Sequence, residues 1–257
     1  GIELGEEGSI GLITYMRTDS ARIAQVAIEE IREFILGKYG KDYLPDSPNV
    51  YKSKETAQEA HEAIRPTSPF REPQKIKEYL TPDQYKLYEL IWKRAVASQM
   101  NPALYEFTSA DIIAGDFLFK AGGSKVLFKG FGLLYTLKED EEEKSFLPKL
   151  TVGEELDLLK ITPSQHFTKP PARYSEGSLV KALEEDGVGR PSTYAPVIQT
   201  ITSRDYVRRI KGYLFPTELG FKVNDLLVEY FPQVMNIEFT ARMEEELHRR
   251  IVGQDDA

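Results

Sequence analysis

The chain has 257 residues, of which 41% are hydrophobic, and a formal net charge of −8 at pH 7. It contains no cysteine, which excludes disulfides, thiolate catalysis and cysteine zinc sites within these residues. No apolar stretch reaches the roughly 18 residues of a membrane span, and no signal-peptide pattern opens the sequence. We therefore expect a cytoplasmic protein without a membrane partner.

Residues 1–102 have the patterning of a helical domain. Apolar spacing and capping residues predict three helices. The first helix is predicted over 21–36. The second begins at the capping-box sequence 56–59 and ends just before Pro66, and the third runs from Thr81 to near Asn101. Asp19 and Ser20 are placed to cap the first of them.

Residues 103–172 change in character and predict a β-rich domain. Aromatic and branched side chains dominate from 104 to 168, with glycines between them, which indicates several strands and turns. The acidic run 139–143 is contiguous rather than alternating, so we interpret it as a solvated loop and not as a metal site. Lys169-Pro-Pro171 is a linker signal.

Residues 173–257 predict a third domain with the element order of a winged helix-turn-helix. A helix over 178–185, a glycine turn and a helix that opens at Arg190 come first. A hairpin over 206–215 and helices near 218–230 and 238–251 complete the order. This order occurs in nucleic-acid-binding and in protein-binding modules. The expected fold class is a multidomain α+β protein.

Tyr15 is the first candidate for chemistry. It ends the apolar stretch GLITY, and Arg17 follows two residues later. In an extended segment both side chains lie on one face, where the guanidinium favours the phenolate and clamps a phosphate oxygen. A helix from residue 21 would add its positive end. The alternatives are a half-buried aromatic and a surface pair of Arg17 with Asp19.

Two further groups of side chains suit an anionic ligand. His61 and Arg65 are four residues apart and would share one face of a helix, either as donors to a phosphodiester or as a surface basic pair. Arg190, Ser192 and Thr193 stand at a helix start after glycines, which makes an anion site or simple capping by Ser192.

Three long motifs together resemble the bacterial type IA DNA topoisomerases. They are GLITYMRTDS, AQEAHEAIRPT and SEGSLVKALEEDGVGRPSTYAPVIQTI, and the likeness extends to NIEFTARMEEEL. The resemblance implies a toroidal fold in which a helical domain carries the nucleophile, a β-rich arch forms the hinge and a winged-helix-like domain binds single-stranded DNA.

The resemblance also implies roles for residues that match the motifs. Tyr15 attacks a DNA phosphodiester and forms a 5′-phosphotyrosine link, Arg17 holds the scissile phosphate and His61 assists. The residues expected to contact DNA are Arg17, Asp19, Arg65, Arg190, Ser192 and Thr193. The expected reaction is ATP-independent cleavage, strand passage and rejoining, which relaxes negatively supercoiled DNA.

The resemblance places one part of the enzyme outside this sequence. Mg²⁺ is expected for the full enzyme, but the TOPRIM domain that supplies its acidic ligands has no match here. The chain also begins with Gly1 rather than methionine, so we expect a central fragment. Without the TOPRIM domain we expect it to be inactive alone, and we expect it to be monomeric. A rival interpretation is a tyrosine recombinase, which also uses Arg, His and a Tyr nucleophile. Its tyrosine follows the histidine, whereas Tyr15 precedes His61 in this sequence. The alternative from another class is a winged-helix DNA-binding module without chemistry.

Overall fold

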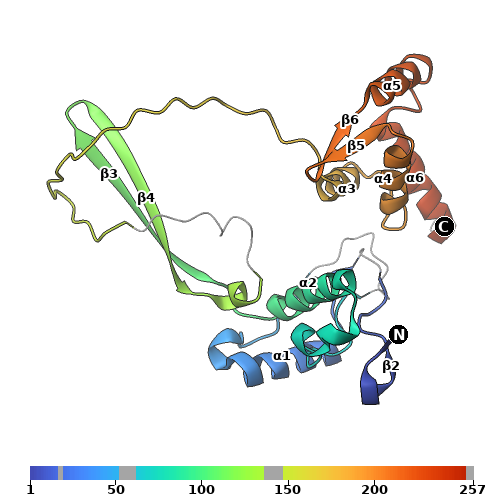
Figure 1. The fold of residues 1–257 in the computed structure, drawn as a ribbon, viewed down its shortest axis with the longest axis horizontal. Helices are drawn as coiled ribbons and strands as arrows, with labels where there is room; N and C mark the ends of the chain where they lie inside the picture. The colour runs from blue at the N-terminus through green and yellow to red at the C-terminus, as the bar shows by residue number, and fades with distance from the viewer. Residues whose placement is uncertain (17–19, 52–61, 136–146, 253–257) are drawn as a thin grey trace. The chain divides into compact units, whose positions relative to one another are not determined.

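A computed structural model describes residues 1–16, 20–51, 62–135 and 147–252. The chain divides into two compact units, 1–160 and 161–257, which Figure 1 shows in chain order from blue to red. None of the described helices is long and apolar enough to cross a membrane. The predicted boundaries at 102 and 172 remain a prediction, and each unit is described by itself.

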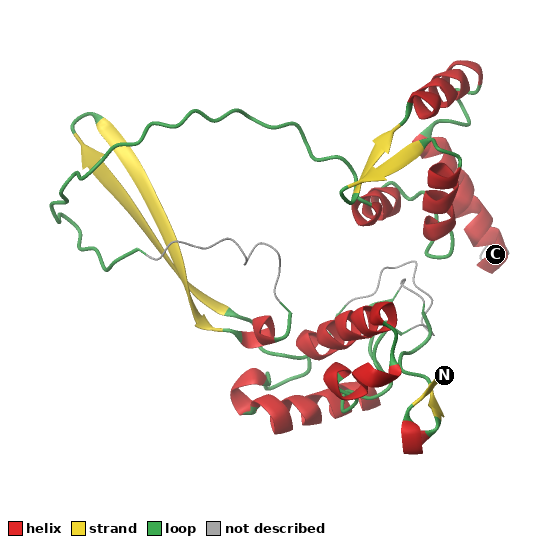
Figure 2. Ribbon diagram, viewed as in Figure 1, coloured by secondary structure: helices red, strands yellow, loops and turns green. Residues whose placement is uncertain are grey.

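The first unit combines two α-helices with short strands, short 3-10 helices and one long hairpin (Figure 2). Its elements are β1 Ile2–Glu3, η1 Gly5–Glu7, β2 Ser9–Ile10, α1 Gln25–Tyr39, η2 Lys41–Tyr43, η3 Pro73–Tyr79, α2 Pro82–Ser98, β3 Leu104–Ala114, β4 Phe117–Phe128 and η4 Gly130–Leu133. Because extended connections join these elements, the described part of 1–102 is less helical than its patterning predicts.

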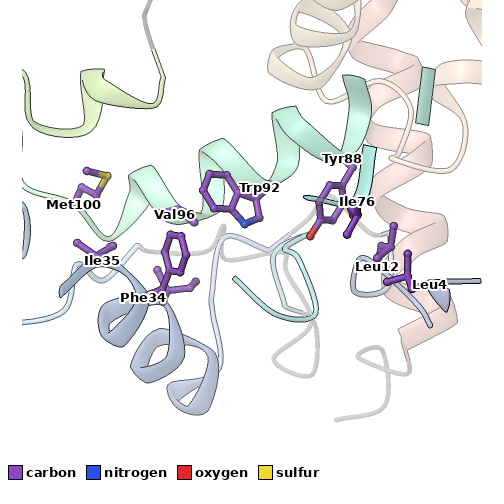
Figure 3. Close-up of a cluster of buried hydrophobic side chains, with 10 residues drawn as sticks. Leu4, Leu12, Phe34, Ile35, Ile76, Tyr88, Trp92, Val96 and Met100 are labelled. Carbon is purple, nitrogen blue, oxygen red and sulfur yellow. The ribbon is translucent and has the colours of Figure 1, made fainter. Parts of the chain in front are cut away.

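The core of the first unit lies between the facing sides of α1 and α2 (Figure 3). Phe34 of α1 and Trp92 of α2 meet edge to face, with ring centroids 5.5 Å apart. The buried Trp92 donates its indole N–H to the carbonyl of Pro69 at 2.8 Å, so its one polar atom is satisfied. Leu12 belongs to the same buried cluster, which ties the segment before Tyr15 to the core.

A buried amide fastens a second connection to α2. Gln99 is fully buried, and its side chain pairs with both backbone groups of Asn49. It accepts from the Asn49 N–H at 3.2 Å and donates to the Asn49 carbonyl at 2.9 Å. The backbone at Asn49, which precedes the second motif in the sequence, is therefore fixed to the end of α2.

The first predicted helix is shifted toward the carboxyl terminus. α1 begins at Gln25, and its N-cap residue is Ala24, which makes no side-chain cap. The prediction of a start at residue 21 capped by Ser20 is wrong, because the carbonyl of Arg22 instead accepts a hydrogen bond from the N–H of Ala63 at 2.7 Å. The other predicted cap, Asp19, lies outside the described residues. At the other end the helix runs to Tyr39 and stops at Gly40, whose φ is 90°.

The helix predicted from Thr81 is confirmed. Thr81 accepts from the N–H of Gln84, and the Gln84 side chain accepts from the N–H of Thr81, which completes a capping box. Pro82 occupies the first helical position, where its missing N–H costs nothing.

The strands of the β-rich region are fewer than predicted. β3 and β4 form one antiparallel hairpin whose register runs from Leu104 opposite Phe128 to Ala114 opposite Phe117. Residues 147–174 contain no strand or helix, so the strands expected up to 168 are wrong over that stretch. The acidic run 139–143 lies outside the described residues.

The second unit has the predicted order of helix, turn, helix, hairpin and two helices. Its elements are α3 Glu176–Glu185, α4 Tyr194–Ser203, β5 Val207–Ile210, β6 Tyr213–Pro216, α5 Glu218–Tyr230 and α6 Ile237–Val252. Among its described residues Leu214 is the single buried hydrophobic side chain. The winged-helix character of this unit remains a prediction.

Candidate active site

The site is built from two segments of the first unit that pair along their backbones. Ile13 lies opposite Pro66 in an antiparallel bridge. The N–H of Thr14 donates to the carbonyl of Arg65 at 2.9 Å, and the N–H of Thr67 donates to the carbonyl of Leu12 at 3.0 Å. The first and second motifs, about 50 residues apart in the sequence, therefore lie side by side.

The side chain of Thr14 strengthens this pairing immediately before Tyr15. Its hydroxyl accepts from the N–H of Arg65 at 3.0 Å and donates to the carbonyl of Ala63 at 3.2 Å. Thr14 thus replaces the backbone partners that a regular ladder would supply. The polypeptide is held firmly up to the residue that carries the candidate nucleophile.

Tyr15 follows this anchored stretch with its side chain exposed. Its exposed fraction is 76%, so the alternative of a half-buried aromatic is wrong. The phenol is open to a large ligand, as attack on a DNA phosphodiester requires.

Beyond Tyr15, the chain is bonded again at Arg22 to the segment that contains Ala63 and Arg65. The N–H of Ala63 donates to the carbonyl of Arg22 at 2.7 Å, while the carbonyl of Ala63 accepts from Thr14. Both ends of the stretch 15–21 are therefore fastened to the HEAIRPT motif. Arg17, Asp19 and His61 lie outside the described residues, and the roles predicted for them remain predictions.

Arg65 is arranged differently from the prediction. Residues 62–65 are not helical, so the idea that His61 and Arg65 share a helix face is wrong over the described part. The Arg65 side chain, 16% exposed, pairs through Nε with Glu62 at 3.1 Å and donates through Nη1 to the carbonyl of Pro66 at 3.2 Å. The side chain thus contacts its own segment, while the backbone of Arg65 pairs with Thr14.

The α1 helix begins later than the start at residue 21 from which a positive helix end near Tyr15 was predicted. The expectation placed a helix start at residue 21, six residues after Tyr15, whereas α1 begins at Gln25. The favourable field of a helix terminus falls off within its first turn. The observed start of α1 therefore lies ten residues after Tyr15 in the sequence, four residues later than predicted.

The turn before α4 in the second unit is closed by its own residues. Thr193 Oγ1 accepts from the N–H of Arg190 at 2.8 Å and donates to the Arg190 carbonyl at 3.0 Å. α4 begins at Tyr194 with Thr193 as its N-cap residue and without a side-chain cap. The alternatives of a helix that opens at Arg190 and of capping by the exposed Ser192 are therefore wrong.

Gly189 explains why this turn carries glycine. Its φ is +81°, and a Cβ at this position would lie 2.9 Å from the ring of Tyr194. A side chain here would be strained in its backbone and blocked by the ring.

A carboxylate that the sequence argument missed occupies the anion position of this turn. Oε2 of Glu244, on α6, accepts from the N–H of Gly189 at 2.8 Å and from Nη1 of Arg190 at 3.1 Å. The prediction of open backbone donors is therefore wrong for Gly189 and Arg190, whose N–H groups are already bonded, while the DNA contact predicted for the Arg190 side chain stays a prediction. A separation of 54 residues leaves no local spacing that could have revealed the contact.

The described residues offer no place for the Mg²⁺ that the resemblance implies. Among them, no three side chains of His, Asp or Glu gather closely enough to hold a metal ion. The described residues thus do not form a site for this ion.

Comparison with known proteins sets this geometry in a family. The family model described as DNA topoisomerase matches residues 6–253. The chain belongs to the DNA topoisomerase family. Two curated members, DNA topoisomerase 1 from Xylella fastidiosa strains 9a5c and Temecula1, are each 48% identical over 264 residues. The two paired motifs therefore lie in a chain that is related to bacterial DNA topoisomerase 1.

The family's solved structures include a close match to this fold. Full-length topoisomerase I from Thermotoga maritima aligns with a TM-score of 0.80 and 39% identity over 97% of this chain, which corresponds to 40% of that protein. The alignments to the Xylella topoisomerases cover 100% of this chain and 32% of each relative. The chain thus spans about a third of the length of the curated topoisomerases it matches.

Proposed function

We propose that this chain forms the nucleophile-bearing part of a type IA DNA topoisomerase, with Tyr15 as the attacking group. The observation that carries the proposal is the backbone pairing of Thr14 with Arg65, which ends at an exposed phenol. A nucleophile for a polymeric substrate must be accessible and yet held at a fixed point. Tyr15 meets both conditions.

The proposed step is an in-line displacement at phosphorus. The phenol oxygen of Tyr15 loses its proton and forms a bond to phosphorus, the bond from phosphorus to the 3′-oxygen breaks, and the 3′-oxygen takes up a proton. The reverse reaction restores the strand, so the phosphotyrosine ester conserves the bond without ATP.

Arg17 and His61 are proposed to stabilise the charge that develops on the non-bridging oxygens. Arg17 follows Tyr15 by two residues, and His61 precedes by two residues the Ala63 that is bonded to Thr14 and Arg22. Positioned charged donors of this kind are typically worth about 2–4 kcal/mol to a transition state. Both residues belong to segments whose neighbours are fastened together.

Contacts along the DNA strand are proposed for Asp19, Arg65, Arg190, Ser192 and Thr193. The exposed Ser192 lies in the turn that Arg190 and Thr193 close. Strand passage, relaxation of negatively supercoiled DNA, a monomeric state and a place in the bacterial cytoplasm belong to the same proposal. So does the inactivity of this chain by itself.

The test exchanges this chain for the matching segment of the Xylella enzyme, to which it is 48% identical. The chimera is incubated with a labelled single-stranded oligonucleotide, and covalent adduct is scored on a denaturing gel. We expect adduct with Tyr15 and a complete loss with Tyr15→Phe, because only the attacking oxygen is removed.

A second tyrosine provides the matched control. Tyr230 has an exposed fraction of 67%, close to the 76% of Tyr15, and lies on α5. Tyr230→Phe should leave adduct formation unchanged. Adduct that persists in the Tyr15→Phe chimera would refute the assignment, and strand binding without adduct in the parent chimera would favour a non-catalytic DNA-binding module.

A further inference from the structure

Glu244 links α6 to the turn that precedes α4. A single carboxylate oxygen, Oε2, receives the N–H of Gly189 at 2.8 Å and Nη1 of Arg190 at 3.1 Å. The side chains of Arg190 and Glu244 are 38% and 27% exposed, so the pair is partly shielded from water. The carboxylate therefore fixes the backbone of the turn and its cation at once.

Arg190 is held at one end of its guanidinium. Nη1 donates to the carbonyls of Gly187 at 3.2 Å and Gly189 at 2.6 Å, in addition to Glu244. Within the described part of the chain, every hydrogen bond of the Arg190 side chain runs through Nη1. A guanidinium has five N–H donors in a planar fork, and none of these hydrogen bonds uses Nε or Nη2, the pair of donors that can bind an oxyanion bidentately.

We propose that Glu244 is a positioning residue, which aims the Nε and Nη2 edge of Arg190 at a phosphate of the DNA strand. The inference rests on the proposed function, because that function places a strand at this turn. Glu244 itself does not touch DNA. It acts through Arg190 and through the backbone of Gly189.

Two other interpretations of the same contacts predict different behaviour. An exposed ion pair typically stabilises a protein by at most about 1 kcal/mol, and a purely structural pair would leave DNA binding unchanged. A carboxylate that competes with the phosphate for Arg190 would weaken DNA binding, so its removal would tighten the complex. A positioning residue predicts the opposite sign, because removing it disorders the donor.

A double-mutant cycle separates these interpretations. The 257-residue chain, Arg190→Ala, Glu244→Ala and the double variant are titrated into a fluorescein-labelled single-stranded oligonucleotide over a range of salt concentrations. We expect Arg190→Ala to weaken binding about tenfold and to reduce the salt slope by about 0.7. Glu244→Ala should weaken binding as well, and adding Arg190→Ala to it should cost no more than about twofold.

Two further variants control for charge and folding. Glu245→Ala removes a negative charge from the next position of α6, where the side chain lies 3.9 Å from Arg249, and should not weaken binding. Glu244→Gln keeps an oxygen acceptor and should stay within about threefold of the parent. Circular dichroism of each variant reports whether α6 and its neighbours remain helical.

Each possible result decides the inference. Tighter binding by Glu244→Ala, or a full tenfold loss on adding Arg190→Ala to it, would overturn the positioning role. If Arg190→Ala changed nothing in the parent chain, both this inference and the proposed strand contact at the turn would fall. The adduct assay on Tyr15 would stand apart from that failure, because it reports the other unit.

Discussion

At the scale of single residues, Tyr15 and Tyr88 place the same side chain in opposite surroundings. Tyr15 is open to solvent, whereas Tyr88 has an exposed fraction of 3%. Burial raises the pKa of the Tyr88 phenol to about 12, and the nearby charge of Arg71 lowers it only in part. The hydroxyl donates to the carbonyl of Arg71 at 2.7 Å, a bond that needs the neutral phenol.

The pKa of Tyr88 predicts how stability changes at alkaline pH. Because the folded pKa is raised above the ordinary value of 10.0, the native state holds the proton more tightly than the unfolded chain. The resulting stability is fully present below about pH 10 and is lost as the pH rises toward about 12. We expect the free energy of unfolding to fall between about pH 10 and about pH 12.

Tyr88→Phe isolates this contribution. The variant loses one hydrogen bond, which costs about 1 kcal/mol near neutral pH, but it has no phenol to titrate at this position. Urea unfolding followed by Trp92 fluorescence should show a smaller alkaline loss in the variant than in the parent. Equal losses in the two proteins would show that Tyr88 does not titrate as proposed.

At the scale of elements, the start of α2 depends on two side chains three residues apart. The Thr81 hydroxyl accepts from the N–H of Gln84, and the Gln84 side chain accepts from the N–H of Thr81. Thr81→Ala should lower the free energy of unfolding by about 1 kcal/mol, while Thr81→Ser, which keeps the hydroxyl, should lower it less. Urea unfolding of both variants measures the difference, and equal stability of Thr81→Ala and the parent would contradict the cap.

The two helices of the first unit mark what could be predicted from sequence. The start of α2 was predictable because every group that defines it lies within four residues. The start of α1 was not, because the carbonyl of Arg22 is bonded to Ala63, and no local pattern records a partner 41 positions away. Apolar spacing alone extended that helix four residues too far toward the amino terminus.

The candidate site also contains features that local sequence predicts and features that it does not. Tyr15 and Arg190 are candidates because their neighbours in the sequence suit a phosphate, and the roles predicted for them rest on the resemblance of the three motifs to the type IA topoisomerases. The pairing of Thr14 with Arg65 and the contact of Glu244 with Arg190 were not predicted, because both join distant segments. Local spacing identified which side chains to consider, and tertiary pairing decided how they are held.

At the scale of the whole molecule, the two units differ in how much apolar surface they bury. The first unit encloses a continuous cluster that includes Ile35, Trp92 and Val96. Among its described residues, the second unit buries one hydrophobic side chain, that of Leu214, and exposes many others on α5 and α6. Examples are Leu219, Phe221, Leu226, Val228, Tyr230, Ile237, Phe239 and Met243. Burial of apolar area is the main stabilising contribution to folding, so the second unit should be the less stable.

This difference predicts two thermal transitions that two probes can separate. Trp92 is the single tryptophan of the chain and lies in the first unit, so its fluorescence reports that unit alone. Helices α3, α4, α5 and α6 hold more residues than α1 and α2, so circular dichroism is dominated by the second unit. On heating, we expect most of the helical signal to be lost at a lower temperature than the tryptophan signal.

A matched pair of truncations assigns each transition to its unit. Leu214→Ala removes the one buried side chain of the second unit's described part, and Val96→Ala removes methyl groups from a fully buried position of the first. Core truncations cost from about 1 to about 5 kcal/mol, more for leucine than for valine. Leu214→Ala should therefore lower only the transition that carries most of the dichroism, and Val96→Ala only the transition that the fluorescence reports. A single transition that both variants move together would mean that the two units unfold as one cooperative body, despite their separate cores.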